Sequence, residues 1–213
     1  MRKRFIIAFI TIFATLFFDQ LIKINVKLNF YYGESIPFIG DWFNIHFVEN
    51  PGMAFGWEFP FLSKEQAKVL LSSFRLVAIG VIFYYLIGLV KRKVSIGLII
   101  SISLIFAGAF GNIIDSLVYG LIFSDSPEYN MSVIAEVVPF GDGYASFLTG
   151  KVVDMFKWSF FPPIFNLADM AISFGVGLII VFQRNVFQNE FFSKKKEAIE
   201  QEKEPSESVE NPS

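Results

Sequence analysis

The chain has 213 residues and a net charge of −2, and 54% of its residues are apolar while only 18% are charged. This balance, which includes 28 phenylalanines, differs from that of a water-soluble domain and indicates a protein whose solvent is lipid. The absence of cysteine excludes disulfides, thiol catalysis and cysteine-bound metal.

Four apolar stretches are long enough to cross a hydrocarbon core of about 30 Å, which takes roughly 20 helical residues. They cover residues 5–24, 69–90, 96–118 and 165–182. The first stretch also fits a cleaved signal peptide, but no small-residue cleavage site follows it and three more spans come after it. We therefore predict an all-α membrane protein with four transmembrane helices.

Basic residues are concentrated at one end of these spans. They occur at 2–4, before the first span, at 91–93, in the short turn between the second and third, and at 184–196, after the fourth. Because basic residues near span ends mark the cytoplasmic side, both termini should be cytoplasmic. The two longer connections, at about 25–68 and 119–164, then lie on the outer side.

The chain divides into a membrane domain over residues 1–192 and a charged tail over 193–213. The tail is rich in Lys, Glu, Ser and Pro, a composition typical of disorder. The first outer connection alternates apolar and polar residues over 42–47, which indicates a strand, and Asn50-Pro51-Gly52 then reads as a turn. We expect a small extracytoplasmic β-rich cap.

The second outer connection contains an apolar run over 133–140 followed by Gly141-Asp142-Gly143, a pattern that suits a hairpin. Its last section, 151–163, is dense in aromatic residues, as is typical of a segment in the membrane interface.

Polar residues recur at helical spacing near the outer ends of three spans, and a fourth aspartate lies in the second outer connection. A carboxylate at the margin of a bilayer is expensive, and it persists mainly where it faces a protein interior or a wet cavity and has a function there. The residues are Asp19 and Lys23, Gly108, Asn112 and Asp115, Asn166 and Asp169, and, in the connection, Asp154.

Each group also has a structural interpretation. Asp19 and Lys23 can form a local ion pair, and Asn112 with Asp115 can provide interhelical hydrogen bonds. Asp169 can stabilise the first turn of its helix, and Asp154 can be an ordinary loop carboxylate. Taken together, four aspartates near one surface favour a shared site, where two carboxylates that share one proton can act as base and acid.

Other chemistries have weaker support. The single histidine, His46, lies on the predicted strand with no serine motif nearby, which disfavours serine hydrolysis. A divalent cation bound by carboxylates stays open, although no EF-hand or His-rich spacing supports one. No glycine loop of the phosphate-binding type is present, and no basic surface for nucleic acid is evident.

At these residues the chain resembles the lipoprotein signal peptidases, also called type II signal peptidases. The resemblance rests on five segments in order along the four predicted spans. They are Asp19-Gln20 with Lys23, the segment 50–55, the segment 108–115, Val152-Val153-Asp154, and Phe165-Asn166-Leu167-Ala168-Asp169.

The resemblance implies an aspartic endopeptidase of the bacterial inner membrane that cuts diacylglyceryl-modified prolipoproteins just before the lipidated cysteine. Asp154 and Asp169 would form its catalytic dyad at the outer face, without metal or other cofactor. The partners would be these precursors and membrane lipids, with no nucleic acid, and the protein would be a monomer. Supporting or substrate-binding roles would fall to Asp19, Lys23, Asn50, Gly52, Gly108, Asn112, Asp115, Asn166 and Ala168.

Two features depart from the family pattern. Ser116 stands where the pattern usually has arginine, so a supporting ion pair is either lost or supplied by another cation such as Lys151. Residues 119–149 look like an insertion that could alter substrate access. The alternatives are a transporter or channel component, disfavoured because the polar residues lie on one side only, and an inactive lipoprotein-binding relative.

Overall fold

The computed structural model describes residues 1–51, 62–130, 132–186 and 188. Four helices within this part are long and apolar enough to cross a membrane, which confirms the predicted spans. The helical elements are α1 (Arg2–Asn29), α2 (Lys64–Arg92), α3 (Ile96–Ile114), η2 (Asp115–Tyr119), α4 (Gly120–Ile122), α5 (Leu167–Leu178) and η3 (Ile179–Gln183).

The helices are longer than the apolar stretches that predicted them. The first continues to Asn29 instead of residue 24, and the third runs through η2, a π-helical turn, and on to Ile122. The polar residues that follow these apolar stretches in the sequence therefore still belong to the helices. A π-helical turn at Asp115 is noteworthy, because such turns occur often at functional sites.

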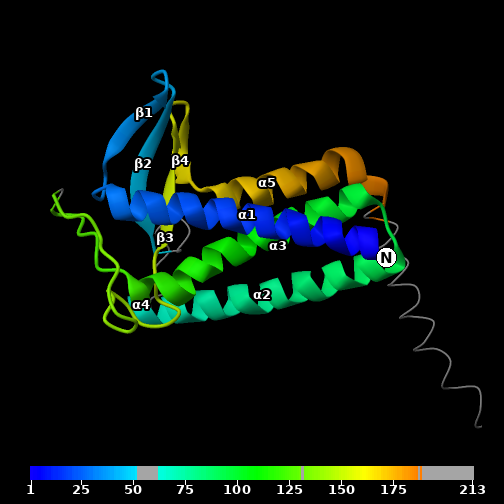
Figure 1. Ribbon diagram of the computed structural model, residues 1–213, viewed down its shortest axis with the longest axis horizontal. Coiled ribbons are helices and arrows are strands. Elements are labelled where there is room, and N and C mark those ends of the chain that lie inside the picture. Colours follow the sequence, from blue (N-terminus) through cyan, green and yellow to red (C-terminus); the bar gives the residue numbers. More distant parts are fainter. Residues whose placement is uncertain (52–61, 131, 187, 189–213) are drawn as a thin grey trace, which may run out of the picture.

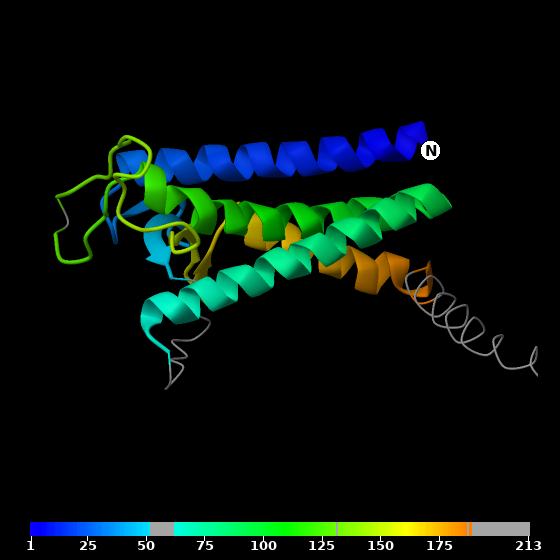
Figure 2. The same ribbon diagram turned by 90° about the horizontal axis from the view of Figure 1, so that it is seen from below.

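α3 is the central helix, with α1 and α2 on opposite sides of it (Figure 2). α5 packs closely on α3 because glycines face their contact. A Cβ at Gly108 would overlap the carbonyl oxygen of Ala168, and one at Gly175 would lie 2.7 Å from the carbonyl oxygen of Ser101. Small residues at such positions let two helix backbones approach in a membrane.

One side of α1 presents aromatic rings to the surroundings. Phe9, Phe13 and Phe17 are all more than half exposed, and each is stacked on the next with ring centroids 6.1 Å apart. Exposure of these apolar rings to water would be unfavourable, whereas contact with the apolar tails of lipids is not.

The predicted cap is a four-stranded antiparallel sheet in the order β1-β2-β3-β4. Its strands are β1 (Ser35–Ile39), β2 (Phe43–Asn50), β3 (Val152–Trp158) and β4 (Phe161–Phe165). The strand predicted at 42–47 is confirmed as β2. The aromatic section 151–163 forms β3 and β4, so the sheet joins both outer connections.

The described residues of the segment 119–149 do not form the predicted hairpin. The run 133–140 makes only isolated bridges, Tyr31↔Ile134 and Phe123↔Val137, because its backbone pairs with segments that follow α1 and α4. The turn after the run is present, with Gly141 at a φ of +99°. These residues and the sheet gather at the end of the bundle opposite the N-terminus (Figure 1).

Candidate active site

Asn166 and Asp169 form a capping box at the start of α5. The Asn166 side chain accepts a hydrogen bond of 2.9 Å from the Asp169 amide, and Asp169 Oδ2 accepts one of 3.2 Å from the Asn166 amide. The box satisfies two backbone donors that a helix start leaves free. It also fixes both side chains at the N-terminal end of the helix.

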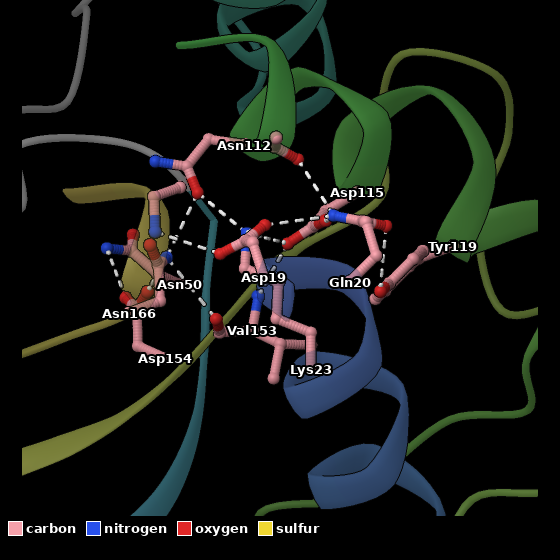
Figure 3. Close-up of polar contacts among 12 residues, drawn as sticks. Asp19, Gln20, Lys23, Asn50, Asn112, Asp115, Tyr119, Val153, Asp154 and Asn166 are labelled. Carbon is pink, nitrogen blue, oxygen red and sulfur yellow. Dashed lines mark hydrogen bonds and ion pairs between the residues drawn. The ribbon is translucent and has the colours of Figure 1, made fainter. Parts of the chain in front are cut away.

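Asp154 lies on β3 and is only 3% exposed. Its Oδ1 accepts a hydrogen bond of 2.6 Å from Asn166 Nδ2, and its Oδ2 accepts one of 3.2 Å from Asn50 Nδ2 (Figure 3). Burial, and next the negative charge of Asp169, raise the pKa of Asp154 to about 7. The structure therefore rules out the reading of Asp154 as an ordinary loop carboxylate.

Asn112 connects three helices at this point. Its Nδ2 donates to Asp169 Oδ1 at 2.8 Å, and its Oδ1 accepts from Asn166 Nδ2 at 3.0 Å and from Lys23 Nζ at 2.8 Å. The interhelical hydrogen bonding expected of Asn112 is thus real, and it reaches Asp169 directly and Asp154 through Asn166.

Lys23 lies between the other two aspartates. Its Nζ is 3.1 Å from Asp19 Oδ2 and 2.9 Å from Asp115 Oδ2, and all three side chains are buried (Figure 3). The local ion pair predicted within α1 exists, but it extends to Asp115 at the start of η2. Within the described residues, no group of acidic or histidine side chains has a metal-binding arrangement.

Asp19 and Asp115 also bind backbone amides of other elements. Asp19 Oδ1 accepts from the Ala168 amide at 2.9 Å, and Asp115 Oδ2 accepts from the Val153 amide at 3.2 Å. These bonds fix the start of α5 and the start of β3, which are the two elements that carry Asp169 and Asp154. Gly111 leaves room for this, since a Cβ there would lie 2.7 Å from Asp19 Oδ2.

Gln20 belongs to the site although its role was not predicted. Its Nε2 donates to Asp19 Oδ2 at 3.1 Å and to Asp115 Oδ1 at 3.1 Å, while its Oε1 accepts from the Tyr119 hydroxyl at 3.1 Å. The sequence signal was its place beside Asp19 in the first quoted motif. Tyr119 gave no such signal, because it lies beyond the apolar window of its span.

A second buried ion pair joins α1 to the outer connections. Lys27 Nζ lies 2.5 Å from Glu49 Oε1 and donates to Ser126 Oγ at 3.1 Å. Lys151 is 3.5 Å from Glu49 and from Asp125. Lys151 therefore links residues 119–149 to β2 by ion pairs. The suggestion that Lys151 replaces the family arginine beside Asp115 is therefore wrong. Gly52 lies outside the described residues, as does the tail 193–213.

The structure brings together all predicted site residues that it describes. The part of the site nearer the sheet consists of Asp154, Asp169, Asn112, Asn166 and Asn50. The part beneath it consists of Asp19, Lys23 and Asp115. The fold and this cluster define a polytopic membrane protein with a carboxylate site at one end of its helices.

Comparison with known proteins identifies the family. The model for signal peptidase (SPase) II matches residues 11–184. A lipoprotein signal peptidase of Porphyromonas gingivalis is 43% identical over 183 residues, which cover 76% of each chain. A lipoprotein signal peptidase of Syntrophus aciditrophicus is 34% identical over 184 residues, which cover 85% of this chain and 94% of that one. The chain belongs to the signal peptidase II family.

A solved structure described as a bacterial membrane enzyme shares the fold. It matches with a TM-score of 0.57 and 26% identity, and the match covers 82% of this chain and 90% of the other. The four spans and the sheet therefore form an arrangement already known in a membrane enzyme.

Proposed function

We propose that the protein is an aspartic endopeptidase that removes signal peptides from diacylglyceryl-modified prolipoproteins, with Asp154 and Asp169 as its catalytic dyad. The observation that carries the proposal is Asn166, because one side chain holds both carboxylates, through Oδ1 of Asp154 and the capping box of Asp169. Two carboxylates held in this way can share one proton.

The different surroundings of the two carboxylates suggest their roles. Asp154 is buried with a pKa of about 7, so it holds a proton and acts as the acid. Asp169 is less buried and acts as the base. It takes a proton from water, whose oxygen attacks the scissile carbonyl carbon, while Asp154 gives its proton to the carbonyl oxygen. The C–N bond of the tetrahedral intermediate then breaks: Asp169 gives the proton that it took from water to the leaving cysteine nitrogen, and Asp154 takes back a proton from a hydroxyl of the intermediate.

The remaining residues position the dyad. Asn112 orients Asp169, and Asn50, on the strand beside β3, orients Asp154. Gly52 is proposed as a substrate contact on the resemblance alone. Asp19, Lys23 and Asp115 hold the elements beneath, and Gly108 with Ala168 lets α3 and α5 approach.

The depth of the site suits a lipid-anchored substrate. The dyad lies where α5 begins and next to the sheet, at one end of the bundle (Figure 1). Basic residues at the other end favour the cytoplasmic side for that end, which supports a site that faces outward from a bacterial inner membrane. A diacylglyceryl anchor would hold the cleavage point at this depth.

Cleavage by the purified protein in detergent tests the proposal. A prolipoprotein with diacylglyceryl cysteine and the same precursor without lipid are incubated with the protein, and the released signal peptide is identified by mass spectrometry. We expect release from the lipidated precursor only, with the cut just before the cysteine. A folded protein that binds the lipidated precursor without cutting it would identify an inactive lipoprotein-binding relative.

A further inference from the structure

The buried face of α2 carries polar side chains that the contacts above do not use. Lys68, Ser72 and Arg75 are spaced four and three residues apart and share one face of the helix. Lys68 is 4% exposed, and its ammonium has no hydrogen-bond partner among the residues that the structure describes. Burial of a charge is expensive unless other charges compensate it, so these cations call for a counter-charge nearby.

This face of α2 is directed at α3 near the dyad. Ile79, one turn beyond Arg75, packs in a buried cluster with Ile113 of α3. Ile113 follows Asn112, whose side chain donates to Asp169. Arg75 therefore approaches the site from the side opposite α1, since α1 and α2 flank α3 (Figure 2).

The counter-charges are the aspartates of the site. The Arg75 guanidinium is attracted by Asp169 and, less strongly, by Asp154, while the Lys68 ammonium is repelled by Arg75 and attracted by Asp115. Ser116 provides no charge at the position where the family pattern has arginine, and its buried Oγ has no partner in the described part of the chain. Arg75 of α2 thus adds a positive charge near the dyad to that of Lys23 of α1.

Among the residues that the structure describes, the charges of the site balance when α2 is included. Lys23 alone would leave four carboxylates with three uncompensated negative charges. With Lys68 and Arg75 one negative charge is left, and the single proton that an aspartic dyad shares removes it. The carboxylates in this count are Asp19, Asp115, Asp154 and Asp169.

We propose that Arg75 is a positioning residue of this active site, whose charge lets Asp154 and Asp169 share one proton while one of them stays ionised. This inference rests on the proposed function, because it assigns Arg75 to the same dyad. Without the guanidinium, the carboxylate that must act as base would hold its proton to higher pH.

The test is the pH dependence of kcat/KM for cleavage of the lipidated precursor by Arg75→Gln, Arg75→Lys and wild type. An adjacent opposite charge shifts a carboxylate by roughly one to three pH units. We expect Arg75→Gln to move both limbs of the profile upward by about one unit, with about a tenfold loss on the acid side. Arg75→Lys should return the profile to its wild-type position.

Lys91→Gln is the matched control, since it removes one positive charge from the exposed cytoplasmic end of the same helix and should leave the profile unchanged. If Arg75→Gln does not fold, Arg75→His, which is neutral above about pH 6.5, should show the shift on the alkaline limb.

A uniform loss of activity with an unmoved profile would overturn the inference, because a structural role lowers the rate equally at every pH. The inference would also be overturned if the pH profile of Arg75→Lys stayed away from its wild-type position. If Asp154→Asn and Asp169→Asn are inactive while Arg75→Gln keeps the wild-type profile, only this inference fails. If those aspartate variants still cleave, the proposed dyad fails and Arg75 loses its role with it.

Discussion

Asn166 donates a hydrogen bond of 2.6 Å from its side-chain amide to Oδ1 of Asp154. The same side chain caps α5 through the Asp169 amide, so one residue couples a strand of the outer sheet to the start of a membrane helix. One side-chain amide therefore links the positions of the two carboxylates.

Replacement of Asn166 separates its two roles. Asn166→Ser keeps a side-chain oxygen that can cap α5 but has no amide to donate to Asp154. Asn166→Ala has neither group, and the missing cap should destabilise the protein by about 1 kcal/mol. We expect both variants to lose about 10²-fold in kcat, the usual effect of removing one organised donor. Thermal unfolding in detergent should show the larger destabilisation for Asn166→Ala. Near-normal kcat in Asn166→Ser would contradict this role.

The pKa of Asp154 predicts a pH-dependent stability. Because burial raises that pKa to about 7 in the folded protein, against 3.8 for the free group, the folded state holds the proton more tightly than the unfolded state. The penalty for the ionised group is absent below about pH 4 and grows as pH rises through 7, to a limit of about 4 kcal/mol.

Asp154→Asn removes this penalty. We expect the unfolding temperature of Asp154→Asn, relative to wild type, to be higher at pH 8.5 than at pH 5. Asp142→Asn, on the exposed turn after the run 133–140, serves as the control and should show no such difference. An equal effect of Asp154→Asn at both pH values would mean that Asp154 titrates normally.

Lys23→Met should be strongly destabilising, because it leaves Asp19 and Asp115 buried without their cation. Breaking a buried ion pair on one side typically costs about 3–5 kcal/mol. The double variant Lys23→Met/Asp115→Asn removes one of the orphaned charges, so we expect it to unfold at a higher temperature than Lys23→Met alone. An additive further loss would show that charge is not the cause.

Lys27→Met should loosen the outer connections while leaving the dyad's own contacts in place. The Lys27 ammonium joins Glu49, on the strand that ends at Asn50, to Ser126 in the segment 119–149. We expect faster proteolysis within 119–149 and a higher KM. Lys3→Met, at the exposed N-terminal end of the same helix, is the control. Unchanged proteolysis would show that other contacts hold this segment.

The spans and the residues of the site could be predicted because their signals are local. Apolar length fixes the helices, and Asn166 three residues before Asp169 is itself the spacing of a capping box. Helical spacing also predicted the pairs Asp19 with Lys23 and Asn112 with Asp115. That these pairs meet at one site followed only from the family motifs and from the side of the membrane they share.

The cations of α2 and the shape of the sheet could not be predicted in this way. Lys68 precedes the apolar window 69–90 and reads as a loop residue, while Arg75 is a single charge inside it. β2 pairs with β3 across about a hundred residues, and no local pattern encodes such a partner. The contacts of Lys27 and Lys151 with Glu49 depend on the same long-range folding.

Single-turnover cleavage of a diacylglyceryl-modified precursor by wild type, Asp154→Asn and Asp169→Asn tests the central claim most directly. Asp142→Asn is the matched control for loss of one carboxylate at the outer end. We predict rapid cleavage by wild type and the control, and no measurable cleavage by either dyad variant, with all four proteins folded. Cleavage by Asp154→Asn or Asp169→Asn at the wild-type rate would contradict the assignment of the dyad.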